Sequence, residues 1–300
     1  MRKSKTVLVL AAGSLGDALL TLPALRYLSA GNEATVAGTS PYNSLGAGLL
    51  GLQRVIPLDP LLQILYSTGD DSSQRDFWRA FDEIFVFFKD KDAAILEKLA
   101  ALSGAQVRFP SKPFSEFLQE GRWAAEYWLE TAASEPVPYD SPYRQTKLKM
   151  DEKFQARGRE LLAELPLKNP FVIHPGSGSR AKNAPLDFFR TAAERAVKES
   201  KKEVLVIWGE AEEKNLGDIR RSFEGIEGVR VLPQILPLAD LAAVLSQCSA
   251  YLGNDSGVTH LAAACGLRTF AIFQTTDARV WGPNEAVIWA ALQSLHLSKK

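Results

Sequence analysis

The segment Val7-Leu8-Val9-Leu10-Ala11-Ala12-Gly13-Ser14-Leu15-Gly16-Asp17 joins a continuous apolar run to a turn that contains two glycines. An apolar run without alternation is typical of a parallel strand that is covered on both faces. After the turn, the leucines of residues 18–28 recur at helical spacing, although Pro23 interrupts the run. The segment therefore predicts a strand, a loop and a helix, which is the repeating unit of an α/β fold.

The same alternation continues through both halves of the chain. Further strands are expected at residues 34–37, 54–58, 83–88, 106–109, 171–174, 203–208, 229–232, 250–252 and 269–273. Helices are expected at residues 93–103, 114–133, 151–165, 186–200, 211–223, 238–247 and 258–264. Strands that alternate with helices predict an α/β protein with two parallel, doubly wound sheets that face each other across a cleft.

Length and composition agree with two domains. A chain of 300 residues with 46% hydrophobic residues can bury two ordinary cores. The periodicity changes after Pro110, and the proline-rich stretch from Pro136 to Pro142 indicates a loop or linker. We therefore predict an N-terminal domain of residues 1–150 and a C-terminal domain of residues 151–300, both Rossmann-like.

Charge and cysteine content limit the classes of partner and compartment. The 35 basic and 35 acidic residues balance, so no overall field attracts nucleic acid, and no nucleic-acid partner is expected. The two cysteines lie in apolar, helix-like contexts that suit a reducing compartment, so we predict a cytoplasmic protein. No apolar run approaches the roughly 20 residues that span a bilayer, so any membrane contact would be peripheral.

The first glycine-containing loop offers two kinds of chemistry. Its A-x-G-x-x-G spacing from Ala11 to Gly16 only partly matches the dinucleotide fingerprint, and no carboxylate follows the second strand near Thr39. A nicotinamide dehydrogenase is therefore disfavoured. Asp17 stands where the loop enters a helix, where a carboxylate caps the helix or favours its dipole. Its alternative role is that of a general base for an acceptor hydroxyl. Both interpretations of Asp17 remain open.

Three further strand ends carry polar residues. The loop from His174 to Lys182 combines small residues with cations, which suits a diphosphate but is also typical of a surface turn. His174 alone is more typical of a hydrogen-bonded core residue. Gly209 and Glu210 could lie against a ribose or base, whereas the following Glu212 and Glu213 are expected to favour a helix dipole.

The segment from Ala250 to Gly266 is the most informative part of the chain. A strand ends there in a polar loop, and the helix that follows can present the N–H groups of Ser256, Gly257 and Val258 to a phosphate. Helix capping by Asp255 or Ser256 explains part of the pattern. It does not explain why a histidine, a threonine and an acid cluster beside a helix of small residues.

At these residues the chain resembles glycosyltransferase family 9, the heptosyltransferases of lipopolysaccharide core assembly and their relatives. Four blocks in the family's order carry the resemblance: Gly16-Asp17 with Thr21-Leu22-Pro23-Ala24-Leu25, His174-Pro175-Gly176-Ser177-Gly178-Ser179 with Lys182, Gly253-Asn254-Asp255-Ser256-Gly257 with His260-Leu261-Ala262-Ala263, and Thr276-Asp277 with Trp281-Gly282-Pro283. The chain departs from the family pattern at Ala184, Gln274 and Thr275, which leaves donor choice open.

The resemblance implies a two-domain fold of the glycosyltransferase B type, in which the last helix crosses back to the N-terminal domain. It implies inversion of the anomeric centre without a bound metal or other cofactor, with Asp17 as the catalytic base. The residues implied for donor and diphosphate binding are Ser177, Gly178, Ser179, Lys182, Gly209, Glu210, Asp255, Ser256, Gly257 and His260. The weaker candidates for acceptor binding are Ser14, Gly16, Lys89 and Lys91, of which the two lysines also fit a solvated run of charges.

The predicted reaction is transfer of a heptose-like sugar, from ADP-heptose, to a lipopolysaccharide core or related acceptor. The partners are thus a nucleotide-diphosphate sugar and a glycolipid or oligosaccharide, with any membrane contact at the cytoplasmic face of the inner membrane. Acceptor recognition is assigned to residues 42–52 and 110–128, where Arg122 and Trp128 suit either a glycolipid or a helix packed on the core. A nucleotide-sugar epimerase and a non-catalytic nucleotide-sugar-binding protein remain as alternatives.

Overall fold

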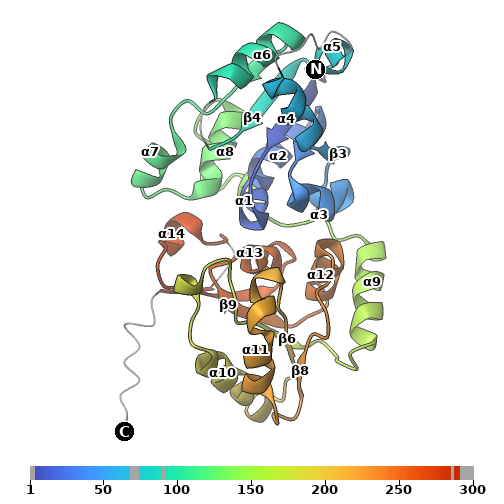
Figure 1. The fold of residues 1–300 in the computed structure, drawn as a ribbon, viewed down its shortest axis with the longest axis vertical. Helices are drawn as coiled ribbons and strands as arrows, with labels where there is room; N and C mark the ends of the chain where they lie inside the picture. Colours follow the sequence, from blue (N-terminus) through green and yellow to red (C-terminus); the bar gives the residue numbers. More distant parts are fainter. Residues whose placement is uncertain (1–3, 68–73, 90–91, 285–286, 291–300) are drawn as a thin grey trace. The chain divides into compact units, whose positions relative to one another are not determined.

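The computed structural model describes residues 4–67, 74–89, 92–284 and 287–290. The chain divides into two compact units, Met1–Lys149 and Met150–Lys300, which we call the N-terminal unit and the C-terminal unit (Figure 1). Each unit has its own parallel sheet with helices packed against it.

The N-terminal unit contains a five-stranded sheet in the order β3-β2-β1-β4-β5, with all neighbouring strands parallel. Its strands are β1 (Thr6–Ala11), β2 (Glu33–Gly38), β3 (Arg54–Pro57), β4 (Glu83–Phe87) and β5 (Gln106–Arg108). Its α-helices are α1 (Leu15–Leu20), α2 (Leu22–Ser29), α3 (Ser40–Leu50), α4 (Asp59–Tyr66), α5 (Arg75–Arg79), α6 (Ala93–Ser103), α7 (Phe114–Gln119) and α8 (Ala124–Ala133), and a 3₁₀ helix, η2, spans Pro142–Arg144.

Alternating side chains bury both faces of this sheet. Leu8 and Leu10 of β1 belong to a buried cluster with residues of α4, α5 and α6, of which Trp78 is fully buried. On β4, the Phe87 ring lies 5.2 Å from the ring of Trp128 in α8, centroid to centroid. Burial on both sides explains why β1 is apolar at every position.

The C-terminal unit contains a six-stranded parallel sheet in the order β11-β10-β9-β6-β7-β8. Its strands are β6 (Phe171–His174), β7 (Val204–Val206), β8 (Val229–Val231), β9 (Ala250–Asn254), β10 (Arg268–Phe273) and β11 (Val287–Ala290). Its helices are α9 (Glu152–Ala163), α10 (Leu186–Lys198), α11 (Leu216–Phe223), α12 (Leu238–Leu245), α13 (Gly257–Ala264) and α14 (Ala278–Trp281), with 3₁₀ helices η3 (Arg180–Lys182) and η4 (Glu210–Asn215).

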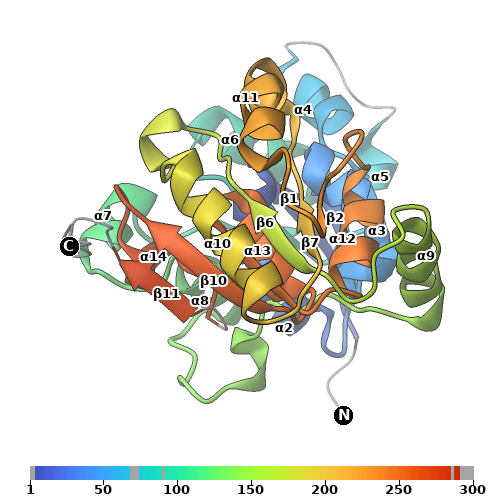
Figure 2. The same ribbon diagram turned by 90° about the horizontal axis from the view of Figure 1, so that it is seen from below.

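Helices α10 and α11 supply Phe189 and Phe223 to a buried cluster with the side chains of β6, β7, β9 and β10. Helix α13 packs against β9 and β10, while α9 and α12 lie side by side (Figures 1 and 2). The predicted α/β class with two parallel sheets is therefore confirmed.

The order of strands reverses once in each sheet. In the N-terminal unit, β2 and β4 lie on opposite sides of β1, and in the C-terminal unit β7 and β9 lie on opposite sides of β6. The loops that leave such neighbouring strands diverge to opposite faces, which opens a crevice at their carboxyl ends where ligands of α/β proteins bind. A ligand site is therefore expected at the carboxyl end of β1 in the N-terminal unit and of β6 in the C-terminal unit.

Several predicted elements differ from the structure in detail. The helix expected at residues 114–133 is two helices, because the chain turns at Gly121 with φ +65°. The helix expected at residues 211–223 begins as the 3₁₀ helix η4. Helices α3, α4 and α5 were not predicted. The last helix was expected to cross back to the N-terminal domain, and this prediction lies mainly outside the described residues. Residues 287–290, which the structure describes, form strand β11.

Within the described residues, no helix combines the length and apolar character needed to cross a membrane.

The contact between α9 and α12 leads to a test of packing. A Cβ atom added at Gly158 in α9 would lie 2.1 Å from the backbone oxygen of Ala243 in α12. We expect Gly158→Ala to lower the free energy of unfolding by about 1–3 kcal/mol, because the two helix backbones would have to separate. Gly217→Ala in α11 is the matched control, since its Cβ would meet only the Arg221 side chain, at 3.7 Å. If denaturant unfolding gave the control a lower free energy of unfolding than Gly158→Ala, this packing would be contradicted.

Candidate functional site

The first group of polar residues lies at the reversal beside β1. Helix α1 begins after Ser14, whose backbone N–H and hydroxyl donate to Oδ2 of Asp17 at 2.9 and 2.8 Å. Asp17 therefore binds back to the start of its own helix, as the capping interpretation predicts. Gly13 has φ +146°, and a Cβ there would lie 2.5 Å from the Asp17 Cβ, so the loop needs glycine at this position.

The other carboxylate oxygen of Asp17 pairs with a lysine from the next strand. Lys89 follows β4, and its Nζ lies 2.8 Å from Oδ1 of Asp17. The same Nζ lies 5.5 Å from the centroid of the Phe114 ring. The side chains of Lys89 and Asp17 are 43% and 18% exposed. Lys89 thus belongs to an ion pair instead of a solvated run of charges, and Lys91 lies outside the described residues.

The surroundings of Asp17 set its protonation state. Burial alone would raise the pKa of this carboxyl group, but the hydrogen bonds from Lys89 and Ser14 outweigh it and hold the pKa below the ordinary value of 3.8. Asp17 is therefore ionised at neutral pH.

The second group lies at the reversal beside β6, where three strand ends meet. Lys182, in the loop after β6, places Nζ 2.7 Å from Oδ2 of Asp255, which follows β9. The same oxygen accepts a hydrogen bond of 2.5 Å from Oγ1 of Thr276, which follows β10. Gln274 also follows β10, and its amide donates to the backbone oxygen of Lys182 at 3.3 Å. These contacts fix a cation at the carboxyl edge of the sheet.

The loop between β6 and α10 is held by a buried asparagine. Asn254 is fully buried, and its Nδ2 donates to the backbone oxygen of Pro175 at 2.8 Å. Its Oδ1 accepts from the Ala184 N–H at 2.9 Å. Within the loop, the Ser177 hydroxyl donates to Oδ1 of Asn183 at 2.6 Å. Asn254 is not among the predicted site residues, although it stands inside the block Gly253-Asn254-Asp255-Ser256-Gly257.

A buried histidine–glutamate pair lies beneath the same loop. His174 is 2% exposed, as expected for a core histidine, and its Nε2 lies 3.2 Å from Oε2 of Glu212. That oxygen also accepts the N–H of Gly209 at 2.9 Å, while a Cβ added at Gly176 would lie 2.0 Å from Oε1. Glu212 was expected to act only on a helix dipole, but it is buried and ties the loops after β6 and β7 together.

Helix α13 begins two residues after Asp255, the partner of Lys182. The hydroxyl of Ser256 accepts the Thr259 N–H at 3.3 Å, and Oγ1 of Thr259 donates to the Asn254 backbone oxygen at 2.5 Å. His260 lies in the first turn and is 6% exposed. The first N–H groups of a helix lack partners within the helix and favour anions. Asp255, the partner of Lys182, and the N-terminus of α13 thus lie on the same connection after β9.

The structure places the predicted site residues in two groups. Ser14, Gly16, Asp17 and Lys89 lie together at the carboxyl edge of the N-terminal sheet. Eight of the ten predicted donor residues lie on the connections that follow β6 and β9 in the C-terminal unit, including η3 and the first turn of α13, namely Ser177, Gly178, Ser179, Lys182, Asp255, Ser256, Gly257 and His260. Gly209 and Glu210 follow β7, the next strand in the sheet.

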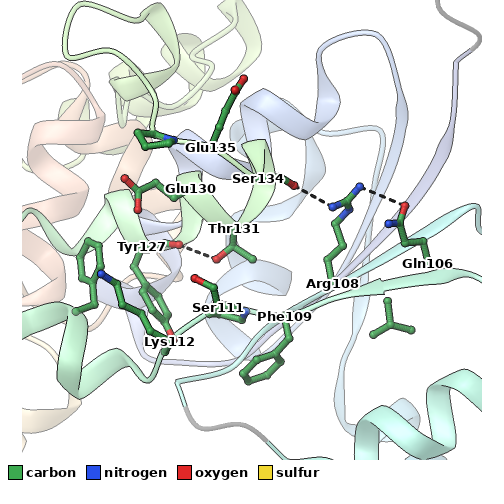
Figure 3. A pocket seen from close by; sticks show the side chains of 14 residues that line it. Gln106, Arg108, Phe109, Ser111, Lys112, Tyr127, Glu130, Thr131, Ser134 and Glu135 are labelled. Carbon is green, nitrogen blue, oxygen red and sulfur yellow. Dashed lines mark hydrogen bonds between the residues drawn. The ribbon is translucent and has the colours of Figure 1, made fainter.

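The N-terminal unit also has a hollow of about 480 Å³ beside β5 (Figure 3). Arg108, at the end of β5, donates to Ser134 and Gln106, and Thr131 donates to the backbone oxygen of Tyr127. Part of the segment predicted to recognise the acceptor, including Ser111 and Tyr127, borders this hollow.

The fold and the two groups define a two-unit α/β protein with a lysine–aspartate pair at the carboxyl edge of each parallel sheet. Comparison with known proteins agrees with this class. The sequence profile of glycosyltransferase family 9 (heptosyltransferase) matches residues 118–299, more than half of the chain. Lipopolysaccharide heptosyltransferase 1 of Pseudomonas aeruginosa is 34% identical over 120 residues, which are 40% of this chain and 33% of that protein. The match thus spans a third of the curated relative.

Solved structures share the fold over nearly the whole chain. The E. coli ADP-heptose lipopolysaccharide heptosyltransferase II aligns with a TM-score of 0.76 and 14% identity, covering 97% of this chain and 94% of that one. A family 9 glycosyltransferase from Veillonella parvula aligns with a TM-score of 0.75 and 16% identity, covering 98% and 88%. E. coli heptosyltransferase WaaC, solved with ADP, aligns with a TM-score of 0.69 and 20% identity, covering 95% and 93%.

The chain belongs to glycosyltransferase family 9. Its two Rossmann-like units match the glycosyltransferase B fold of the solved heptosyltransferases, as the sequence predicted.

The His174–Glu212 pair leads to a test of stability. Burial would raise the pKa of Glu212, but the hydrogen bonds from His174 and Gly209 hold it below the ordinary value of 4.5. At pH values above the ordinary pKa of 4.5, the ionised Glu212 carboxylate therefore stabilises the fold. This stabilisation is lost as the pH falls through the lowered pKa of the folded protein. At about pH 7 we expect Glu212→Gln to lower the free energy of unfolding by about 1–3 kcal/mol. The difference should shrink on acidification, whereas the exposed neighbour Glu213→Gln should have little effect at either pH.

Equal stability of Glu212→Gln and the wild type at neutral pH, measured by denaturant unfolding, would show that this pair does not hold the two loops.

Proposed function

We propose that this protein is an inverting glycosyltransferase that moves a heptose-like sugar from a nucleotide-diphosphate donor to a glycan acceptor of the lipopolysaccharide type. The observation that carries the proposal is the ion pair of Lys182 with Asp255, a residue that directly precedes the N-cap of α13, in a chain of this family. The similar E. coli structures are of an ADP-heptose heptosyltransferase and of a heptosyltransferase with ADP, so ADP-heptose is the first donor to consider.

The C-terminal unit provides the chemistry for the donor. A diphosphate needs positive charge and N–H donors, which Lys182 and the first turn of α13 would supply. Ser177, Gly178 and Ser179 lie on the loop that Asn254 and Glu212 hold, where small residues allow phosphate oxygens to approach. Gly209 and Glu210, after the neighbouring strand, would lie near the nucleoside.

The N-terminal unit provides the base. In the proposed reaction the acceptor hydroxyl attacks the anomeric carbon, and the bond from that carbon to the diphosphate oxygen breaks. Asp17 accepts the hydroxyl proton, while the leaving diphosphate keeps the electron pair of the broken bond. Lys182 and the N-terminus of α13 stabilise the negative charge that builds on the diphosphate, so this proposal requires no metal.

We assign acceptor binding to the N-terminal unit, around Ser14, Gly16 and Lys89, with Lys91 as a further candidate. The natural acceptor would be a lipopolysaccharide core or a related glycan on the cytoplasmic face of the inner membrane, which the protein would contact peripherally from the cytoplasm.

Donor binding is testable by calorimetry with ADP, UDP, GDP, dTDP and NAD. We expect one diphosphate to bind saturably and Lys182→Ala to weaken it about 10- to 100-fold, because a hydrogen bond to a charged group contributes about 1.5–3 kcal/mol. Lys198→Ala is the control, since this lysine is exposed in the last turn of α10. Binding of NAD alone, or equal affinity of the wild type and Lys182→Ala, would contradict a diphosphate site at Lys182.

The base is testable with the donor that calorimetry identifies. We expect Asp17→Asn to lower kcat by about 10²- to 10⁴-fold, because the amide cannot accept the proton. Its donor affinity should stay unchanged, since Asp17 lies in the other unit. Asp59→Asn is the control, because Asp59 is an exposed carboxylate in the first turn of α4.

Full activity of Asp17→Asn would show that Asp17 is not the catalytic base. Conversion of the donor to an epimer without any acceptor would favour an epimerase instead.

A further inference from the structure

Gln274 is a polar side chain of the C-terminal unit to which the proposed reaction gives no role. It directly follows β10 and is half-buried at the carboxyl edge of the sheet. It is also one of the three positions at which the chain departs from the family pattern. A role of Gln274 in binding would therefore be a property of this chain and not a feature shared by the family.

A hydrogen bond fixes the orientation of the Gln274 amide. Its Nε2 donates to the backbone oxygen of Lys182 at 3.3 Å. Because a carbonyl oxygen only accepts hydrogen bonds, the end of the amide that faces Lys182 must be the NH₂ group. The oxygen Oε1 lies at the other end, and it has no hydrogen-bond partner among the residues that the structure describes. Gln274 thus offers an oriented acceptor that a ligand can use.

The two threonines that follow Gln274 differ from it in this respect. Thr276 donates its one hydroxyl hydrogen to Oδ2 of Asp255, the oxygen that also pairs with Lys182. Thr275 is exposed. Of the three polar side chains after β10, Gln274 is therefore the one that combines a fixed orientation with an oxygen that makes no hydrogen bond.

The order of strands predicts which part of the donor lies near Gln274. The strands β7, β6, β9 and β10 lie side by side in this order, about 4.8 Å apart. In the proposed donor site, the nucleoside lies beside the residues after β7, and the diphosphate lies beside the connections after β6 and β9. A nucleotide sugar carries its nucleoside and its sugar at opposite ends of the diphosphate. The sugar would therefore lie on the β10 side, where Gln274 stands.

The sugar also offers the kind of group that Gln274 lacks. Phosphate oxygens are acceptors, so they cannot donate to Oε1 of Gln274. A sugar hydroxyl can donate to Oε1, and the second hydrogen on Nε2 can in turn bind the oxygen of a neighbouring hydroxyl. The amide is thus matched to the sugar and not to the diphosphate beside it.

We propose that Gln274 is a specificity-determining residue, whose amide oxygen accepts a hydrogen bond from a hydroxyl group of the donor sugar. The inference rests on the proposed function and adds the residue by which the donor site recognises the sugar. The bond from Nε2 to Lys182 orients the amide before the donor binds, which reduces the entropy that binding costs.

Calorimetry with ADP and with ADP-heptose separates recognition of the sugar from binding of the diphosphate. Gln274→Met keeps the length of the side chain but removes the amide. We expect this variant to bind ADP like the wild type and ADP-heptose about 3- to 10-fold more weakly, because a hydrogen bond between neutral groups contributes about that factor.

A second glutamine at the end of a strand of the same sheet provides the matched control. Gln234 follows β8, an edge strand, and its side chain is exposed. Gln234→Met removes the same amide group at a distance of four strands from β10. We expect it to bind both ADP and ADP-heptose like the wild type.

Two results would overturn the proposal. If Gln274→Met lost the same factor in affinity for ADP and for ADP-heptose, Gln274 would only support Lys182. If it kept the wild-type affinity for both ligands, Gln274 would not contact the donor. Failure of the proposed function is distinct, because it would appear as equal affinity of the wild type and Lys182→Ala for the diphosphate itself.

The hydroxyl that Gln274 contacts can be identified with ADP-heptose analogues that each lack one hydroxyl group. We expect one analogue to bind the wild type about 3- to 10-fold more weakly than ADP-heptose, and to bind Gln274→Met as well as ADP-heptose does. If every analogue lost the same factor in the wild type and in Gln274→Met, no sugar hydroxyl would donate to Gln274, and the proposal would be wrong.

Discussion

Both candidate groups depend on the same constraint, the single reversal of strand order in each parallel sheet. Because the loops after β1 and β4 leave towards opposite faces, Asp17 and Lys89 meet at the carboxyl edge between them. The reversal between β6 and β9 brings Lys182 to Asp255 in the same way. The cores that bury these strands therefore also determine where charged side chains meet. Weakening a core contact such as that of Phe87 with Trp128 would disturb the edge as well as the stability.

Each edge pairs one lysine with one mostly buried carboxylate. Asp255 and Asp17 are 7% and 18% exposed, whereas Lys182 and Lys89 are 31% and 43% exposed. The carboxylates are therefore the fixed members, and the lysines are the members that a ligand can reach. In the proposed donor site this arrangement would leave Lys182 accessible to phosphate oxygens, and in the N-terminal unit it holds the Asp17 carboxylate in its ionised form.

The sequence predicted those parts that local signals determine. The apolar run before Gly13, the glycine loop and the helix after it place Asp17 correctly, and the four blocks indicate the family. The sequence could not reveal the partner of Asp17, because Lys89 is distant in the chain and meets it only through the pairing of β1 with β4. Glu212 was misjudged for a related reason. Its acidic neighbours suggest an exposed first turn, but burial against His174 and Gly176 depends on the neighbouring strand. The break between α7 and α8 was also missed, although Gly121, with its positive φ, marks it.

The most direct test of the account is a crystal structure of the protein with ADP, or with whichever nucleoside diphosphate binds. We expect the diphosphate at the carboxyl edge beside β6, with its oxygens within hydrogen-bond distance of Lys182 Nζ and of the first N–H groups of α13. The 2.7 Å contact between Lys182 and Asp255 should lengthen as the lysine turns to the phosphate. An ordered nucleotide bound elsewhere, with that contact unchanged, would contradict the assignment of the C-terminal unit to the donor.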